Sequence, residues 1–150
     1  MTGRQRKVIT LEDVIKMRCF LDTNILLDFL LPNRPGQDDA KDILLMGNAG
    51  YLNLLVSDLT IANIAYITRK EISREDFYRV MTTLQRCYAI VPLGQAVMNS
   101  ALAAKWDDFE DALQYYSAVQ AGADCIITRN TKDYTQAELP IITPKDFLKK

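Results

Sequence analysis

The sequence contains no histidine among its 150 residues. This absence excludes Ser-His and Cys-His catalytic triads, histidine zinc sites and imidazole general bases. Any chemistry must therefore use carboxylates, amides, hydroxyls, thiols, lysine or arginine. Long apolar runs are also missing, because no stretch approaches the roughly 20 residues that span a membrane. The first 16 residues carry no apolar segment of the secretory kind, so we expect neither a secretory signal nor a membrane contact.

Cysteine is sparse and glycine-rich loops are absent. The three cysteines, Cys19, Cys87 and Cys125, are widely spaced and form no Cys-x-x-Cys pair. Two of them lie in expected strands, which is typical of buried, reduced thiols in a cytoplasmic protein. The lack of a glycine-rich phosphate loop, and of a second acid shortly after Asp22, disfavours a phosphatase or nucleotide-binding domain. The formal net charge of −1 gives no overall attraction to nucleic acid, although a local basic patch is sufficient for binding.

Short apolar runs alternate with longer helical patterns along the chain. Because such alternation is typical of a parallel sheet covered on both faces, we expect one α/β domain, a three-layer α/β/α sandwich. The expected strands are 18–21, 52–56, 88–92, 125–128 and 141–142, and the expected helices are 25–31, 38–47, 58–70, 74–87, 95–105, 108–121 and a last short one from 144.

Polar residues collect directly after several of these strands. Asp22-Thr23-Asn24 follows the first strand, Ser57-Asp58 the second, and the segment 129–133 the fourth. In open parallel sheets the ligand crevice lies beyond the carboxyl ends of the strands. Asp22 has two interpretations at this stage, because Asp is both a favoured helix N-cap and a ligand for a metal ion.

The densest acidic cluster lies in Trp106–Ala118, "WDDFEDALQYYSA". Asp108 and Asp111 are three residues apart and share one face of the expected helix. Acids in a first helical turn also complement the helix dipole, so the cluster alone does not prove a site. Together with Asp22 and Asp133 it indicates a hard cation such as Mg²⁺ or Mn²⁺, for which metal-assisted phosphodiester hydrolysis is the natural reaction.

Four segments together resemble a PIN domain, and most closely the small prokaryotic PIN proteins related to VapC-type toxins. They are "FLDTNILLDFLL", "VSDLTIANIAYITRK", "DFEDALQYYSAVQAGADCIITRNTKDY" and "PIITPKDFL", in the family's order and spacing over roughly residues 17–147. The resemblance implies a small α/β/α sandwich with a parallel sheet. We accordingly expect residues 1–16 to be an N-terminal extension and residues 17–150 to form the PIN-like domain.

The resemblance also implies a function. It predicts a Mg²⁺- or Mn²⁺-dependent endoribonuclease, the toxin of a type II toxin–antitoxin system, which acts on RNA, forms a homodimer and is silenced by a cognate antitoxin. Asp22 and Asp111 are expected to bind the metal, with Asp108 and Asp133 as further catalytic acids. The residues expected to orient water, ligands or substrate are Thr23, Asn24, Asn63, Thr128, Arg129 and Asn130.

Two positions depart from the family pattern. Asn63 occupies the place of a common Glu, and Asn130 stands where a fourth acid is usual, so the site has two fewer negative charges. Asn63 is interpreted either as a satisfied core amide or as a site residue, since its neighbours are apolar. Weaker metal binding follows, with Glu110, Asp108 or Asp133 as possible compensation. The alternative function is therefore a catalytically weak or inactive PIN fold that binds RNA or protein.

Overall fold

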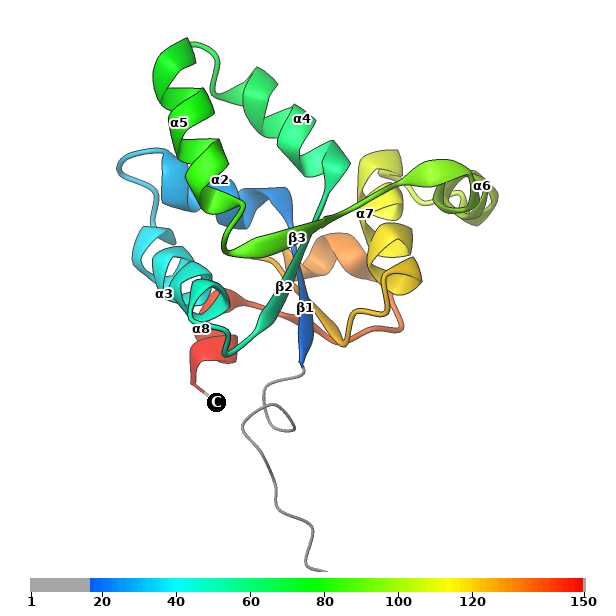
Figure 1. Cartoon of the computed structure of the whole chain (residues 1–150). Coiled ribbons are helices and arrows are strands. Elements are labelled where there is room, and N and C mark those ends of the chain that lie inside the picture. Colours follow the sequence, from blue (N-terminus) through cyan, green and yellow to red (C-terminus); the bar gives the residue numbers. More distant parts are fainter. Residues whose placement is uncertain (1–16, 150) are drawn as a thin grey trace, which may run out of the picture.

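The computed structural model describes residues 17–149, so the expected extension at residues 1–16 lies outside the described chain (Figure 1). All strand pairs in its one five-stranded sheet are parallel, in the order β3-β2-β1-β4-β5. This confirms the predicted parallel sheet. The strands are β1 (Arg18–Leu21), β2 (Asn53–Ser57), β3 (Tyr88–Val91), β4 (Cys125–Ile127) and β5 (Ile141–Ile142).

Seven α-helices and one short 3-10 helix connect and cover the described strands. The sequence places two of their starts well, because the helices expected from residues 74 and 144 begin there, capped by Ser73 and Thr143. None of the described helices has the length and apolar character needed to cross a bilayer. The helices are α2 (Thr23–Leu30), α3 (Gln37–Asn48), α4 (Asp58–Ile67), α5 (Arg74–Leu84), α6 (Gly94–Ala104), α7 (Phe109–Gln120), η1 (Thr131–Tyr134) and α8 (Pro144–Leu148).

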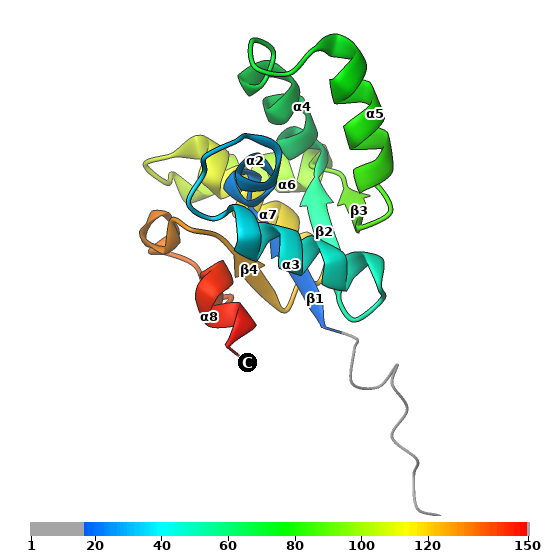
Figure 2. The same ribbon diagram turned by 90° about the vertical axis from the view of Figure 1, so that its left-hand side faces the viewer.

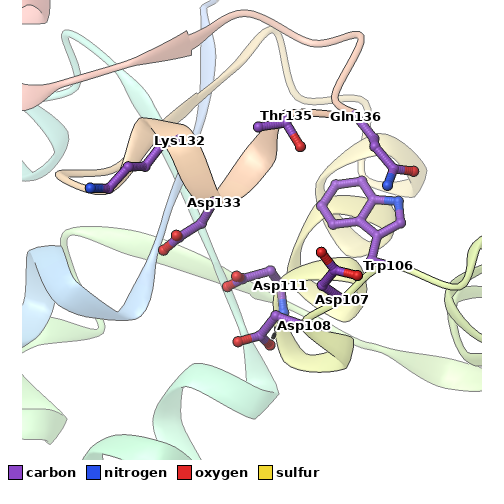
Figure 3. A pocket seen from close by; sticks show the side chains of 8 residues that line it. All are labelled: Trp106, Asp107, Asp108, Asp111, Lys132, Asp133, Thr135 and Gln136. Carbon is purple, nitrogen blue, oxygen red and sulfur yellow. Dashed lines mark hydrogen bonds between the residues drawn. The ribbon is translucent and has the colours of Figure 1, made fainter.

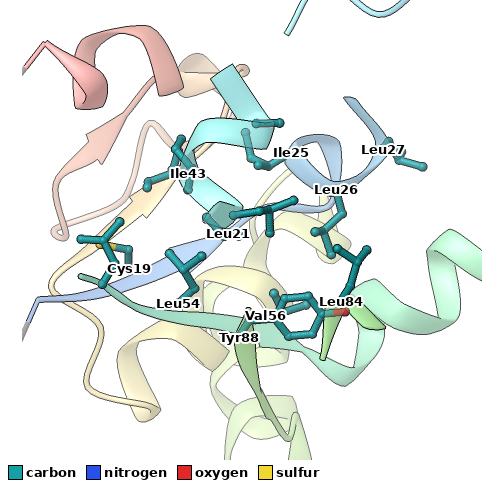
Figure 4. Packing of buried hydrophobic residues seen from close by; sticks show 14 of the residues in the cluster. Cys19, Leu21, Ile25, Leu26, Leu27, Ile43, Leu54, Val56, Leu84 and Tyr88 are labelled. Carbon is teal, nitrogen blue, oxygen red and sulfur yellow. The ribbon is translucent and has the colours of Figure 1, made fainter. Parts of the chain in front are cut away.

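The sheet separates two apolar layers, because alternate strand residues point to opposite faces. Cys19 and Leu21 of β1 pack with α2 and α3 on one face, whereas Phe20 packs with α7 on the other. Figure 4 shows the first of these clusters, and Figures 1 and 2 show the helices on either side of the sheet. The predicted three-layer sandwich is therefore confirmed.

The strand order creates a topological switch point beside β1. The chain passes from β1 outward to β2 and β3, and later returns to place β4 against the other side of β1. The connections after β1 and β4 consequently diverge to opposite parts of the fold, which is the topological switch point where open α/β sheets bind ligands. The side chains that follow β1 and β4 meet at this point.

Candidate acidic active site

Asp22 lies at the carboxyl end of β1 and is the N-cap of α2. Its side chain is buried, and its Oδ1 accepts a hydrogen bond from the Thr23 backbone N–H at 2.7 Å. Oδ2 accepts from the Thr128 hydroxyl at 2.8 Å and from the Asn24 amide at 3.3 Å. The capping interpretation is thus correct but incomplete, because Asp22 is also tied to the residue that follows β4.

Thr128 and Asn24 connect the ends of the two strands. The Thr128 hydroxyl accepts from the Asn24 amide at 3.0 Å and from the Asn130 backbone N–H at 3.1 Å. Asn24 Oδ1 in turn accepts the Arg129 backbone N–H at 3.2 Å. The Asn130 side chain is exposed, so this residue joins the network through its backbone. The two short polar motifs therefore form one hydrogen-bonded unit that fixes the Asp22 carboxylate.

The start of α7 supplies the remaining acids. Asp108 is the N-cap of α7, and its Oδ1 accepts the Asp111 backbone N–H at 3.1 Å. Figure 3 shows the carboxylates of Asp108, Asp111 and Asp133 turned toward a common space between α7 and η1. This space is part of a cavity of about 280 Å³. Its lining residues are Trp106, Asp107, Asp108, Asp111, Lys132, Asp133, Thr135 and Gln136.

Crowding of these acids changes their protonation. Burial, followed by repulsion from Asp108 and Asp22, raises the pKa of Asp111 to about 7. Burial also raises the pKa of Asp22, against the opposing hydrogen bonds from Thr128 and Thr23. The pKa of Glu110 is raised by burial and by the charges of Asp108 and Asp22. The carboxylates therefore lie close enough to repel one another, and a bound cation would relieve that repulsion.

Asn63 of α4 lies at the edge of this cluster and not inside the core. Its side chain is half-buried, and its Nδ2 donates to Glu110 Oε1 at 2.9 Å. The interpretation of Asn63 as a core amide is therefore wrong, because Thr60 and Ile64 form the buried face of α4. Asn63 instead holds Glu110, an acid that we did not include among the expected catalytic residues, toward the site.

A buried polar network underlies the acids. Gln114, one turn after Asp111, donates to the Thr60 hydroxyl at 2.7 Å and to the Thr23 hydroxyl at 3.1 Å. Its Oε1 accepts the Ser57 hydroxyl at 2.6 Å. These contacts fix α7 against the starts of α2 and α4. Sequence reasoning missed Gln114, although an amide three residues after Asp111 on an otherwise apolar inner face is a detectable signal.

The Arg129 guanidinium contacts a carboxylate outside the acidic cluster. Its Nη2 donates to Asp28 Oδ1 at 3.0 Å, its Nε donates to Asp28 Oδ2, and Arg34 Nε donates to Asp28 Oδ1 at 3.0 Å. The Arg129 guanidinium therefore pairs with a buried carboxylate of α2, and only its backbone joins the Asp22 network. A Cβ at Gly36 would stand 2.3 Å from Asp28 Oδ2, so only glycine fits beside this pair.

The acidic cluster is not a finished metal cage. Within residues 17–149 no group of three or more His, Cys, Asp or Glu side chains is arranged to hold a metal ion. The charges of Asp108, Asp22 and Asp133 nevertheless contribute to the raised pKa of Asp111. Of the expected positioning residues, Thr23, Asn24 and Thr128 contact the Asp22 carboxylate directly.

Comparison with known families identifies most of the chain. The family model described as a PIN domain matches residues 18–132, from the first residue of β1 into η1. No curated protein matches the sequence with significance. The matched span includes Asp22, Asn63, Asp108 and Asp111 and ends one residue before Asp133.

Solved structures share this fold at low sequence identity. A toxin–antitoxin complex from Klebsiella pneumoniae has 23% identity and a TM-score of 0.63, over 84% of this chain and 97% of that chain. VapBC2 from Rickettsia felis, bound to a DNA fragment from its promoter, has 17% identity and a TM-score of 0.66, over 85% and 98%. VapC20 from Mycobacterium tuberculosis, described as a sarcin-ricin loop cleaving toxin, has 11% identity and a TM-score of 0.58, over 72% and 86%.

Proposed function

This chain belongs to the PIN domain family, and from that premise we propose that it is a divalent-metal-dependent endoribonuclease. The observation that carries the proposal is the crowding of Asp22, Asp108, Asp111, Glu110 and Asp133 at the switch point, without a cationic partner for Asp22 or Asp111 in the described contacts. Acids that repel one another beside a cavity at the carboxyl edge of a parallel sheet suit a ligand that brings positive charge.

The donor chemistry fits Mg²⁺ or Mn²⁺. Hard divalent cations prefer carboxylate and amide oxygens and keep several waters, so a site need not supply every ligand from the protein. We assign Asp22 and Asp111 as the residues that hold the ion. An ion bound there supplies charge neutralisation at the phosphate and lowers the pKa of a coordinated water.

The other residues have supporting roles in this proposal. Thr128, Asn24 and the Thr23 backbone fix the Asp22 carboxylate through the three contacts described above. Asp108 and Asp133 attract the ion and orient its waters, and Asn63 holds Glu110 at the same edge. Lys132, on the cavity lining, is the cation closest in sequence to Asp133 and is available to contact a phosphate.

The biological role that we propose is the toxin of a toxin–antitoxin pair. The similarity to toxin–antitoxin complexes, including one from Klebsiella pneumoniae, supports an antitoxin partner. The family resemblance further suggests a homodimer and an antitoxin segment that covers the acidic cavity. A basic segment would fit that position, because the cavity is lined by four aspartates.

A second candidate function is a PIN fold that binds RNA or protein without cutting RNA. The amides at Asn63 and Asn130 favour it, because both replace acids that PIN nucleases commonly use. Glu110 argues against a loss of activity, because it supplies a carboxylate at the same edge of the site. Asn63 Nδ2 holds that carboxylate by donating to Glu110 Oε1 at 2.9 Å.

Calorimetric titration with Mn²⁺ and an RNA cleavage assay separate the two functions. We expect binding heat, and Mn²⁺-dependent cleavage of a mixed-sequence single-stranded RNA pool that EDTA abolishes. Asp22→Asn and Asp111→Asn should each remove both signals, because each deletes a proposed ligand charge. Asp42 is an exposed residue of α3, so Asp42→Asn is the matched control and should change neither the binding heat nor the cleavage.

The outcomes have distinct meanings. Binding heat without cleavage of the RNA pool would favour the binding module. Cleavage that survives Asp22→Asn, or that proceeds fully in EDTA, would contradict the assignment of this site.

A further inference from the structure

Tyr134, the last residue of η1, places a buried hydroxyl beside the acidic site. The residue is only 3% exposed, and its ring meets Trp106 edge-on, with centroids 6.2 Å apart at 80°. The hydroxyl oxygen is inaccessible to solvent and makes no hydrogen bond to any described residue. The ring thus belongs to the apolar core, while the polar end of the side chain is left without a partner.

An unmade hydrogen bond of this kind is costly. A buried polar group without a partner destabilises a fold by about 1–3 kcal/mol, and most buried polar groups are satisfied. A phenylalanine would fill the same apolar space without that cost. A hydroxyl retained at this position therefore calls for a partner that joins the site when it is in use.

The neighbours of Tyr134 place its hydroxyl at the acidic site. Tyr134 directly follows Asp133, and its ring packs on Trp106, and both of these neighbours line the acidic cavity. The hydroxyl interacts with the Asp22 carboxylate and lowers the pKa of Asp22, which burial raises. The two groups therefore lie beside each other, without the geometry of a full hydrogen bond.

Tyr88 provides the internal contrast. It has the other buried hydroxyl without a partner among the described residues, at the start of β3. Burial and then Cys87 raise the pKa of Tyr88 to about 12, with no carboxylate among the causes. Tyr88 is thus a second buried tyrosine whose hydroxyl has no acid acting on it.

We propose that Tyr134 is a positioning residue, whose hydroxyl donates to the Asp22 carboxylate when a divalent cation is bound. The inference rests on the proposed function, since it assumes that Asp22 is a ligand. Asp22 already accepts from Thr23, Asn24 and Thr128. A fourth donor from η1 fixes the carboxylate from the side of the cavity, and outer partners of this kind hold metal ligands in their binding orientation.

The test is a Mn²⁺ titration followed by tryptophan fluorescence. Trp106 is the only tryptophan in the sequence and lines the acidic cavity, so a paramagnetic ion bound there should quench it. We expect Tyr134→Phe to weaken Mn²⁺ binding about tenfold, the lower end of the effect of losing such a partner. Tyr88→Phe should bind Mn²⁺ as the parent protein does.

A stability measurement without metal accompanies the titration. Tyr134→Phe should unfold at the same denaturant concentration as the parent protein or a higher one, because it removes a hydroxyl that has no partner. Weaker Mn²⁺ binding in a variant of undiminished stability is a result that a purely structural role would not give.

Three outcomes would overturn the inference. Equal affinities of Tyr134→Phe and the parent would do so while the proposed metal site stands. Equal weakening by both tyrosine variants would assign the effect to general packing. Absence of Mn²⁺ binding by the parent, with Asp22→Asn unchanged from it, would remove the proposed metal function together with the inference.

Discussion

Asp22 and Asp28 are two buried carboxylates six residues apart, at the start and within α2, yet their surroundings are opposite. Asp28 accepts hydrogen bonds from two guanidinium groups, those of Arg34 and Arg129. Among residues 17–149, the hydrogen bonds to Asp22 come from neutral donors, and the charge of Asp133 adds to the rise in its pKa. One helix therefore contains an acid that is fully compensated and an acid that is not.

The difference separates buried acids that stabilise the fold from acids that are free to bind a ligand. A buried acid that serves the fold needs cations of the same chain, because an unpaired buried charge is costly. The acids around Asp22 lack such partners and repel one another, as the raised pKa values of Asp111 and Glu110 show. The region around Asp28 is thus complete as it stands, whereas the region around Asp22 requires a ligand from outside.

The largest effect should come from breaking the compensated pair. Asp28→Asn keeps the side-chain volume but removes the charge that both guanidinium groups contact. Loss of one partner of a buried ion pair costs about 3 kcal/mol at the lower end of measured values. Urea denaturation of the metal-free protein should show a loss of this size.

The exposed pair of Arg79 and Asp76 is the matched control for Asp28. Its Arg79 Nη2 and Asp76 Oδ1 atoms are 2.9 Å apart on solvent-exposed side chains, so water screens the pair and Asp76→Asn should leave the urea midpoint close to that of the parent protein. An equally small loss for Asp28→Asn would contradict the contrast between the two regions.

A smaller effect should follow from making the uncompensated region more acidic. Asn63→Asp removes the donor to Glu110 and adds a like charge beside it. We expect the metal-free protein to lose about 1 kcal/mol, a typical size for partly exposed charges. The same variant should bind Mn²⁺ about tenfold more tightly, equivalent to about 1.4 kcal/mol. Calorimetry measures the Mn²⁺ affinity, and urea denaturation measures the stability of the metal-free protein. Tighter Mn²⁺ binding without a loss of stability would contradict the repulsion between the carboxylates.

The smallest effect should be the pH dependence of the metal-free protein. Folded Asp111 has a pKa of about 7, above its ordinary 3.8, so between these values the folded state keeps a proton that the unfolded chain has lost. Its contribution to stability is therefore present at low pH, declines as the pH rises toward 7, and is lost above 7.

Asp111→Asn removes this contribution. In EDTA the variant should be more stable than the parent at pH 7.5 and should show a flatter dependence of unfolding free energy on pH between 5 and 7.5. Denaturation at several pH values measures both quantities. A stability of the parent that rises over the same interval, with the variant unchanged, would contradict the raised pKa of Asp111.

Local signals in the sequence predict most of the fold. Apolar runs of two to five residues coincide with the strands. Ser73, Asp108 and Thr143 mark helix starts, because a side-chain cap acts within one turn. Helix ends are less well predicted: α4 ends at Ile67, where Thr68 closes it by donating to the Ile64 carbonyl at 2.8 Å, and not near residue 70.

The contacts that complete the site depend on distant partners. The sequence places Arg129 among the expected positioning residues after β4, but it does not reveal that the guanidinium meets Asp28 across 101 positions of sequence. Asn63 meets Glu110 in the same way, across 47 positions. The spacing of apolar residues along the sequence does not predict side-chain contacts over such distances. Asp28 did offer a signal, since a charge within "ILLDFLL" must find a partner when it is buried.

The central position of β1 in the sheet has a consequence for the order in which the site forms during synthesis. Asp22 is synthesised before Thr128, whose hydroxyl fixes it across 106 positions, and β4 must pair with β1 before the two side chains can meet. Contacts of such long range close late in folding. A nascent chain that has not yet exposed α7 and η1 lacks Asp108, Asp111 and Asp133. Under the proposed function, such a chain has no complete site and does not cleave RNA on the ribosome that makes it.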